Sequence, residues 1–185
     1  MDTVIITKRL TLRPLRDEDA AAIFKSLNDY DVSRNLARVP YPYLLSDAQV
    51  FIDWTRSLDH RSAMRALCLS QSPDVLFGIM SYEYSADQQD AELGYWLAKS
   101  MWNKGFGKEA ASAMVDHAFN VSGAEKLVSG FFKDNPVSGK ILSGVGFEPI
   151  ADSTQFSKAQ GHEVPISKMQ LTRERWLKQR QGIVE

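Results

Sequence analysis

The stretch Trp102-Asn103-Lys104-Gly105-Phe106-Gly107-Lys108-Glu109-Ala110 decides the fold. It follows a predicted strand over Ala91–Ala98 and opens a predicted helix over Lys108–Asn120. Glycines in such a turn let the backbone approach a ligand, and the first N–H groups of the helix form an anion site. Two lysines at a helix start disfavour the helix unless an anion offsets them. The stretch therefore predicts a phosphate or pyrophosphate site, with an ordinary tight turn as the alternative.

A dinucleotide-binding fold is the competing interpretation of this turn. Gly105-x-Gly107-x-x-Ala110 fits the G-x-G-x-x-A pattern, and Glu125 follows at the usual interval. In that fold, however, the glycine turn follows its strand directly and the acidic residue ends the next strand. Here several residues separate Ala98 from Gly105, and Glu125 precedes the next predicted strand. A nucleotide-dependent oxidoreductase is therefore the less favoured prediction.

The composition predicts a single domain over residues 1–185, with a charged C-terminal tail over residues 173–185. Apolar residues make up 44% of the chain, and 22 basic against 23 acidic residues leave a net charge of −1. This balance predicts neither a nucleic-acid partner nor a membrane partner. The single cysteine, Cys68, excludes an intrachain disulfide, and with no leader peptide or spanning segment predicted we expect a cytoplasmic protein. The histidines are scattered and predict no metal site.

The predicted elements have a mixed order, a β-meander followed by β-α-β-α-β-β. Predicted strands cover Thr3–Leu15, Met64–Leu69, Val75–Tyr84, Ala91–Ala98, Lys126–Phe132, Phe147–Ala151 and Val164–Thr172, with turns at Ser70–Asp74 and Ser85–Asp90. Predicted helices start near Asp17, at a Ser46–Gln49 capping box and at Lys108, and two more cover Asn135–Ser143 and Arg173–Arg180. The last of these helices is expected to be solvated.

Further motifs lie in a fixed order around the glycine turn. They are Arg9–Leu15 with Asp17 and Asp19, Ala91–Leu97, and Asn135-x-x-Ser138 ending in Gly144–Phe147. Together with Trp102-x-x-Gly105-x-Gly107, this set resembles the GNAT superfamily of N-acetyltransferases, whose turn reads Q/R-x-x-G-x-G/A. The tryptophan resembles the Rim-type branch, which acetylates the N-termini of ribosomal proteins. Each motif is short, but the ordered set covers nearly the whole chain.

The resemblance implies a mixed α/β fold with a central, mostly antiparallel twisted sheet, flanking helices and a splayed pair of parallel strands. The splayed pair would be Ala91–Ala98 and Lys126–Phe132, whose unpaired backbone groups would meet the pantetheine arm of acetyl-CoA. The resemblance thus implies acetyl-CoA as co-substrate and no metal. The implied acetyl-CoA contacts are Leu97, Ala98, Asn103, Lys104, Gly105, Phe106, Gly107, Lys108, Asn135 and Lys140. A backbone N–H at Leu97 or Ala98 would also hold the oxyanion, and Lys140 would meet the ribose phosphate.

Acetyl transfer to an amine needs a base, because an amine with a pKa near ~10 is mostly protonated at neutral pH. Glu92 is the predicted base, since it precedes the turn on the strand where several family members carry a catalytic glutamate. Strand alternation places it on one face with Gly94 and Trp96. Glu83 is the second choice, and a surface or salt-bridged role for Glu92 stays open.

The leaving thiolate needs an acid, and many family members supply a tyrosine seven residues after the asparagine. Leu142 occupies that place here, so Ser138 is the predicted acid, as in the Rim-type branch. Asn135 would cap the helix and hold the pantetheine arm. A purely structural role for Ser138 also stays open.

The acceptor side is predicted from aromatic residues in the early loop and second helix, where the resemblance places the acceptor groove. The predicted acceptor contacts are Tyr41, Tyr43, Trp54 and Glu83. The Rim-type branch often has a glutamate where Ser157 stands, so this chain departs from it. The predicted function is acetyl transfer from acetyl-CoA to a primary amine, on a protein N-terminus or a small molecule. A non-catalytic acyl-CoA-binding regulatory module is the alternative, and a homodimer is expected by family analogy alone.

Overall fold

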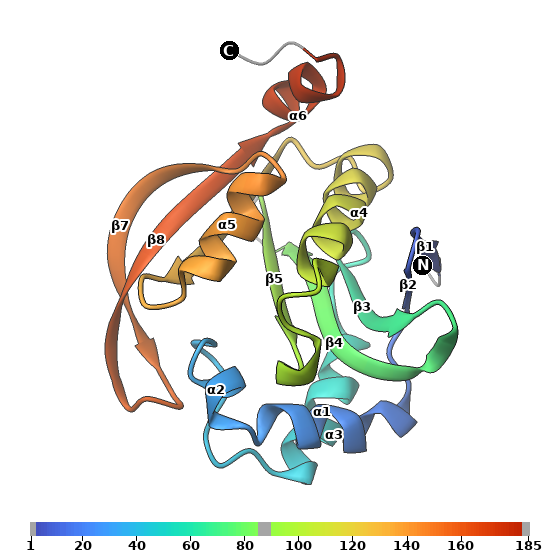
Figure 1. Ribbon diagram of the computed structural model, residues 1–185, viewed down its shortest axis with the longest axis vertical. Coiled ribbons are helices and arrows are strands. Elements are labelled where there is room, and N and C mark those ends of the chain that lie inside the picture. The colour runs from blue at the N-terminus through green and yellow to red at the C-terminus, as the bar shows by residue number, and fades with distance from the viewer. Residues whose placement is uncertain (1–2, 85–89, 183–185) are drawn as a thin grey trace.

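The computed structural model describes residues 3–84 and 90–182, and these form an α/β structure around one sheet. The strands are β1 (Ile5–Ile6), β2 (Leu10–Arg13), β3 (Ala63–Leu69), β4 (Ser72–Tyr84), β5 (Ala91–Leu97), β6 (Lys126–Phe132), β7 (Glu148–Ser157) and β8 (His162–Thr172). The helices are α1 (Ala20–Leu27), α2 (Tyr30–Ser33), α3 (Leu45–Thr55), α4 (Phe106–Asn120), α5 (Pro136–Gly144) and α6 (Arg173–Arg180), with short 3-10 turns η1 (Asp17–Asp19) and η2 (Lys99–Met101). The strand order is β1-β2-β3-β4-β5-β6-β8-β7 (Figure 1). No helix in these ranges is long and apolar enough to cross a membrane.

The sheet contains the predicted splay. β5 and β6 are its parallel pair, and their register runs only through Ala91–Leu127 and Glu92–Val128. Beyond Glu92 the two strands continue without further pairing, while β4 stays paired with β5 as far as Leu97. The Ser129 hydroxyl donates a hydrogen bond of 2.8 Å to the Leu93 carbonyl at the point where pairing stops. The mixed, mostly antiparallel fold is therefore confirmed.

Two apolar cores cover the two faces of the sheet. On one face α4 and α5 pack with Leu93, Leu97 and Leu127, and on the other α1 and α3 pack with Ile79 and Trp96. The alternation predicted for β5 is thus confirmed, and it sends neighbouring residues of one strand into different cores. Figure 1 shows α4 and α5 next to each other, with α1, α2 and α3 grouped at the other end.

Several predicted boundaries are wrong. The strand predicted over Thr3–Leu15 is divided into β1 and β2, because Thr7 N–H donates to the Leu10 carbonyl and turns the chain. The helix α3 begins at Leu45, where Asp47 accepts from the Leu44 N–H, so the Ser46–Gln49 capping box does not form. The strand predicted to end at Ala151 continues as β7 to Ser157, and α4 begins two residues earlier than predicted, at Phe106. The Ser85–Asp90 turn falls mostly on residues 85–89, outside the described ranges.

The C-terminal helix α6 is helical as predicted, but it is solvated on one side only. Its Trp176 is buried against Phe119 of α4, with ring centroids 5.1 Å apart, and its indole N–H donates to Asp116 over 3.0 Å. Burying an indole with its N–H satisfied stabilises this contact. The charged helix is therefore docked on α4.

We expect His117 on α4 to make the stability of the fold depend on pH. Its Nδ1 lies 2.7 Å from the Tyr82 hydroxyl, and burial, followed by the charge of Arg65, lowers the pKa of the imidazole. A lowered pKa means that the unfolded chain takes up the proton first, so stability is full above the unfolded pKa of about 6.5 and falls below it. We expect the melting temperature to fall between about pH 7.5 and 5.5, and to fall less in His117→Gln, as measured by thermal unfolding. His60→Gln is the control, since His60 is exposed; an equal fall in all three proteins would contradict the assignment.

Candidate active site

One cavity of about 1200 Å³ opens at the splay and connects both faces of the sheet. On one side it is lined by the glycine turn, the start of α4 and residues of α5. On the other side it is lined by α3, the loop between α2 and α3, and residues of the β7–β8 hairpin. A cavity that reaches from the predicted anion site to the other face of the sheet can hold two substrates in contact. We call the part of it on the face of α1 and α3 the acceptor chamber.

The glycine turn has the backbone conformation of an anion cradle. Asn103 has a φ of 59° and Gly105 a φ of 77°, so two residues of the turn are left-handed, and Gly105 caps the N-terminus of α4. Backbone N–H groups in such a turn converge on an anion, and the helix dipole adds to the attraction. The predicted residues Asn103, Gly105, Phe106, Gly107 and Lys108 all line the cavity.

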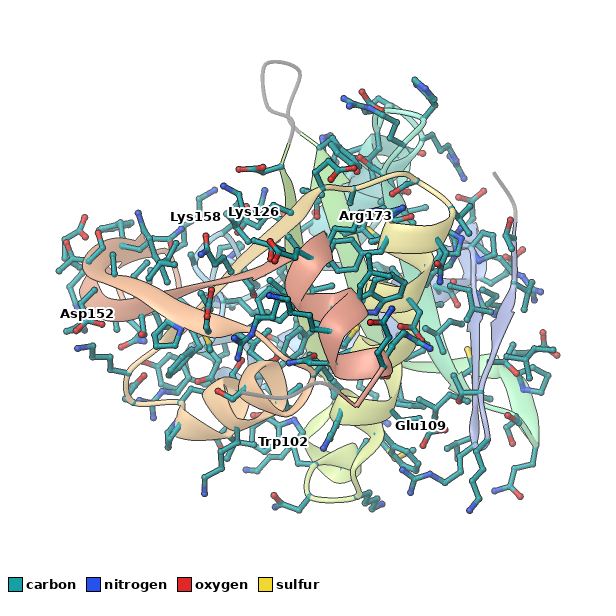
Figure 2. The ribbon with its side chains drawn as sticks, turned by 90° about the horizontal axis from the view of Figure 1, so that it is seen from above. Trp102, Glu109, Lys126, Asp152, Lys158 and Arg173 are labelled. Atoms are coloured by element: carbon teal, nitrogen blue, oxygen red, sulfur yellow. The ribbon has the colours of Figure 1, made fainter. Side chains whose placement is uncertain are left out.

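An ion pair between Arg9 and Glu109 holds this turn in place. The Arg9 guanidinium donates to Glu109 over 2.6 Å and to the Lys104 carbonyl over 2.9 Å, and it lies 4.6 Å from the centroid of the Phe106 ring. Thr7 donates to the same carboxylate over 2.6 Å. Burial acts to raise the pKa of Glu109, but these hydrogen bonds outweigh it and lower the pKa. Figure 2 labels Glu109 and Trp102 at the end of the molecule where the turn enters α4.

Not every predicted acetyl-CoA residue lines the cavity. Leu97 lines the cavity and Ala98 does not. The Ala98 N–H donates to the Phe77 carbonyl over 2.7 Å. Ala98 is therefore not available as an oxyanion donor. Lys104 is exposed and directs its ammonium toward the Met101 sulfur, and Lys140 is exposed on α5 outside the cavity. The Trp102 indole donates to the Leu97 carbonyl over 2.8 Å, which ties the turn to β5.

The two candidate bases face each other across neighbouring strands. Glu83 on β4 pairs in register with Glu92 on β5, and both line the cavity on the face of α1 and α3. Glu83 is held in place, because it accepts from Ser81 over 2.9 Å and its carboxylate lies 3.8 Å from the Arg38 guanidinium. Glu92 is exposed, and it forms no ion pair with any residue in the described ranges. Glu92 is therefore the freer of the two carboxylates.

Ser138 has a partner that sequence reasoning missed. The Tyr95 hydroxyl lies 2.7 Å from Ser138 Oγ and also donates to the Ser138 carbonyl over 3.2 Å. Burial raises the pKa of Tyr95 to about 12, although the bond to Ser138 acts to lower it, so the phenol stays protonated. Asn135 caps α5 as predicted, accepting from the Ser138 N–H. The alternation that places Glu92, Gly94 and Trp96 on one face of the strand also places Tyr95 on the opposite face, and this was the signal that could have found it.

On the acceptor side, Tyr43, Trp54 and Glu83 line the cavity and Tyr41 does not. Tyr41 is exposed and packs on Tyr30, with ring centroids 5.1 Å apart. Burial raises the pKa of Tyr43 to about 12. Within residues 3–84 and 90–182 no cluster of side chains has the composition of a metal site.

Comparison with known proteins agrees with this geometry. The family model described as an acetyltransferase (GNAT) domain matches residues 9–148, so the chain belongs to the GNAT family of acetyltransferases. The uncharacterized N-acetyltransferase p20 of Bacillus licheniformis is 26% identical over 165 residues, which cover 88% of this chain and 92% of p20. The fold is similar to that of spermidine N-acetyltransferase from Vibrio cholerae, solved with CoA and spermine (TM-score 0.79, 18% identity, 92% of this chain and 99% of that one). It is equally similar to ribosomal-protein-S5-alanine acetyltransferase from Vibrio fischeri (TM-score 0.79, 14% identity, 95% and 99%).

Proposed function

We propose that this N-acetyltransferase takes its acetyl group from acetyl-CoA and transfers it to a primary amine. The observation that carries the proposal is that one cavity is lined by the glycine turn, the unpaired edges of β5 and β6, the Glu92 carboxylate and the hydroxyls of Tyr95 and Ser138. The left-handed turn at Gly105 and the start of α4 fit a pyrophosphate. The free edges of β5 and β6 beyond Glu92 fit the amides of a pantetheine arm.

In the proposed reaction, the residues on the two faces of β5 act in different proton transfers. Glu92 accepts the proton that the ammonium group of the acceptor must lose, and the free amine attacks the thioester carbonyl. The C–N bond forms and the C–S bond breaks, and the nitrogen loses its second proton to water. Ser138 donates a proton to the leaving sulfur and recovers one from water, or relays one from water. The Tyr95 hydroxyl lies 2.7 Å from Ser138 Oγ, and either hydroxyl can donate to the other. In our scheme Tyr95 holds the serine oxygen in place, and the serine hydrogen turns to the sulfur when the thiolate leaves. Tyr95 is a positioning residue in this scheme.

A thiol-release assay tests the proposal directly. The protein is mixed with acetyl-CoA and a panel of primary amines, and free thiol and acetylated amine are measured together. Release of both in equal amounts is the expected result. Binding of acetyl-CoA without release of thiol for any amine would favour the acyl-CoA-binding alternative.

A glycine pair at the two ends of α4 tests the pyrophosphate site. Gly105 (φ 77°) and Gly123 (φ 72°) are both left-handed, so alanine strains the backbone at each. Gly105 lines the cavity, and a Cβ there would lie 3.4 Å from Arg9 Nη2, whereas Gly123 lies outside the cavity and has nothing within 4 Å. We expect Gly105→Ala to raise the acetyl-CoA Kd about tenfold, or about 1.4 kcal/mol, with Gly123→Ala unchanged. Calorimetry measures the Kd, and thermal unfolding compares the loss of stability. If both folded variants bind acetyl-CoA with the same Kd, the turn at Gly105 does not bind the pyrophosphate.

A further inference from the structure

The acceptor chamber has an acidic end and an apolar end on one floor. Three cross-strand pairs of β4 and β5 form this floor, in the order Glu83–Glu92, Ser81–Gly94 and Ile79–Trp96. All six residues line the cavity, on the face covered by α1 and α3. If an ammonium group binds at the carboxylates, the rest of the ligand lies along the floor toward Trp96 or extends into the chamber.

Gly94 keeps the middle of this floor open. A Cβ added there would lie 3.7 Å from its nearest neighbour, Ser81 Oγ, which is an ordinary contact, and the backbone has no left-handed φ. The fold itself therefore does not require glycine at this position. The missing side chain leaves room beside Glu92 for the body of an acceptor.

Apolar side chains form the walls. Val50 and Trp54 stand one turn apart on α3, and they remain 68% and 40% exposed although both line the cavity. Further wall residues are Leu36, Val39, Tyr43 and Phe51. Covering such exposed apolar side chains with an apolar ligand removes their surface from water, which makes the free energy of binding more favourable.

The chamber is closed across its outer side. The Lys158 N–H donates to the Ala37 carbonyl over 3.0 Å, and the Gln160 amide donates to the Arg34 carbonyl over 2.8 Å. These bonds join the β7–β8 hairpin to the loop between α2 and α3, and Figure 1 shows the hairpin reaching beside α2. A polypeptide lying across the groove would have to break this bridge, so the closure favours a small molecule.

The charges at the outer part of the chamber disfavour a polyamine. Three further carboxylates line the cavity, and each is already engaged. Asp31 lies 2.5 Å from Lys99, Asp134 lies 2.6 Å from Arg34, and Asp47 accepts from the Leu44 N–H over 2.8 Å. Arg38 and Lys158 also line the cavity. A second and third ammonium group would therefore meet cations and engaged carboxylates, whereas a single ammonium finds Glu92.

We infer that the acceptor is a small primary amine carried on an apolar body of about the size of one aromatic ring, the class of phenethylamine. The inference rests on the proposed function and narrows its substrate. The amine lies at Glu92, and the ring lies over Gly94 between Trp96 and the α3 wall.

The test compares kcat/KM for phenethylamine, spermidine, ethylamine and a short peptide with an N-terminal alanine. We expect phenethylamine to exceed the others at least tenfold, since one methylene in an apolar pocket already changes kcat/KM by about 10–200-fold. Gly94→Ala should lower kcat/KM for phenethylamine about tenfold and lower it less for ethylamine, which has no ring to lie over Gly94. An unchanged melting temperature and an unchanged acetyl-CoA Kd show that the variant is folded.

The outcomes separate the two proposals. A preference for spermidine or for the peptide, or an equal loss for both amines in Gly94→Ala, would overturn the inference and leave acetyl transfer standing. If no amine releases thiol, the proposed function fails, and calorimetry with the CoA-saturated protein decides the inference. Tighter binding of phenethylamine than of spermidine would then support it, and the reverse order or no binding would overturn it.

Discussion

Glu92→Gln is expected to lower kcat by about 10²–10⁴-fold at neutral pH, because the acceptor amine arrives protonated and loses its base. Glutamine keeps the shape of the side chain and removes only its ability to take a proton. The loss should shrink as the pH rises toward the amine pKa of about 10, where the amine deprotonates unaided. The full pH–rate profile of both proteins, measured with saturating acetyl-CoA, checks this expectation.

Glu83→Gln is the matched control for this experiment. Glu83 is the cross-strand neighbour of Glu92 on the same face of the sheet. Its carboxylate is held by Ser81 and Arg38, so it is less free to meet the amine. We expect a smaller fall in kcat for this variant and an unchanged shape of the pH profile. If Glu83→Gln removes the neutral-pH activity while Glu92→Gln keeps it, the base is Glu83 and Glu92 only lines the chamber.

Local sequence patterns predicted most of the elements, because alternation, capping and glycine turns act over a few residues. The strand β7 shows where such signals stop. From Pro149 to Phe156 its residues are exposed, so no apolar alternation marks it, and only pairing with β8 extends it to Ser157. The splay itself was implied by the family resemblance, since no local pattern states which strands fail to pair.

The parts of the site that sequence reasoning missed all depend on contacts between distant residues. Arg9 meets Glu109 across 100 positions, and Tyr95 meets Ser138 across 43. The bond from Ala98 to Phe77 is of the same kind, and it removes a donor that the strand position alone had suggested. Which groups are free for a substrate follows from tertiary pairing, and the sequence shows only which groups exist.

Ser138→Ala is expected to lower kcat by about 10–10³-fold, the lower part of the range for a general acid, because a thiolate with a pKa near ~8.5 is already a fair leaving group. The acetyl-CoA Kd should change little, since one neutral hydrogen bond contributes only about 1 kcal/mol. Ser138→Thr keeps the hydroxyl and is the control. Loss of affinity with an unchanged kcat would make Ser138 a binding residue and water the acid.

Tyr95→Phe separates catalysis by this pair from simple packing. The phenol holds Ser138 Oγ at 2.7 Å, so its removal should lower kcat by less than the loss of Ser138 itself. Because the two hydroxyls act as one unit, the double variant Tyr95→Phe, Ser138→Ala should be no slower than Ser138→Ala alone. An acetyl thioester with a more acidic thiol should shrink the kcat loss of both single variants, since a better leaving group needs less help. If the losses add in the double variant and stay constant across thioesters, Tyr95 supports the fold of β5 and α5 and has no part in protonating the sulfur.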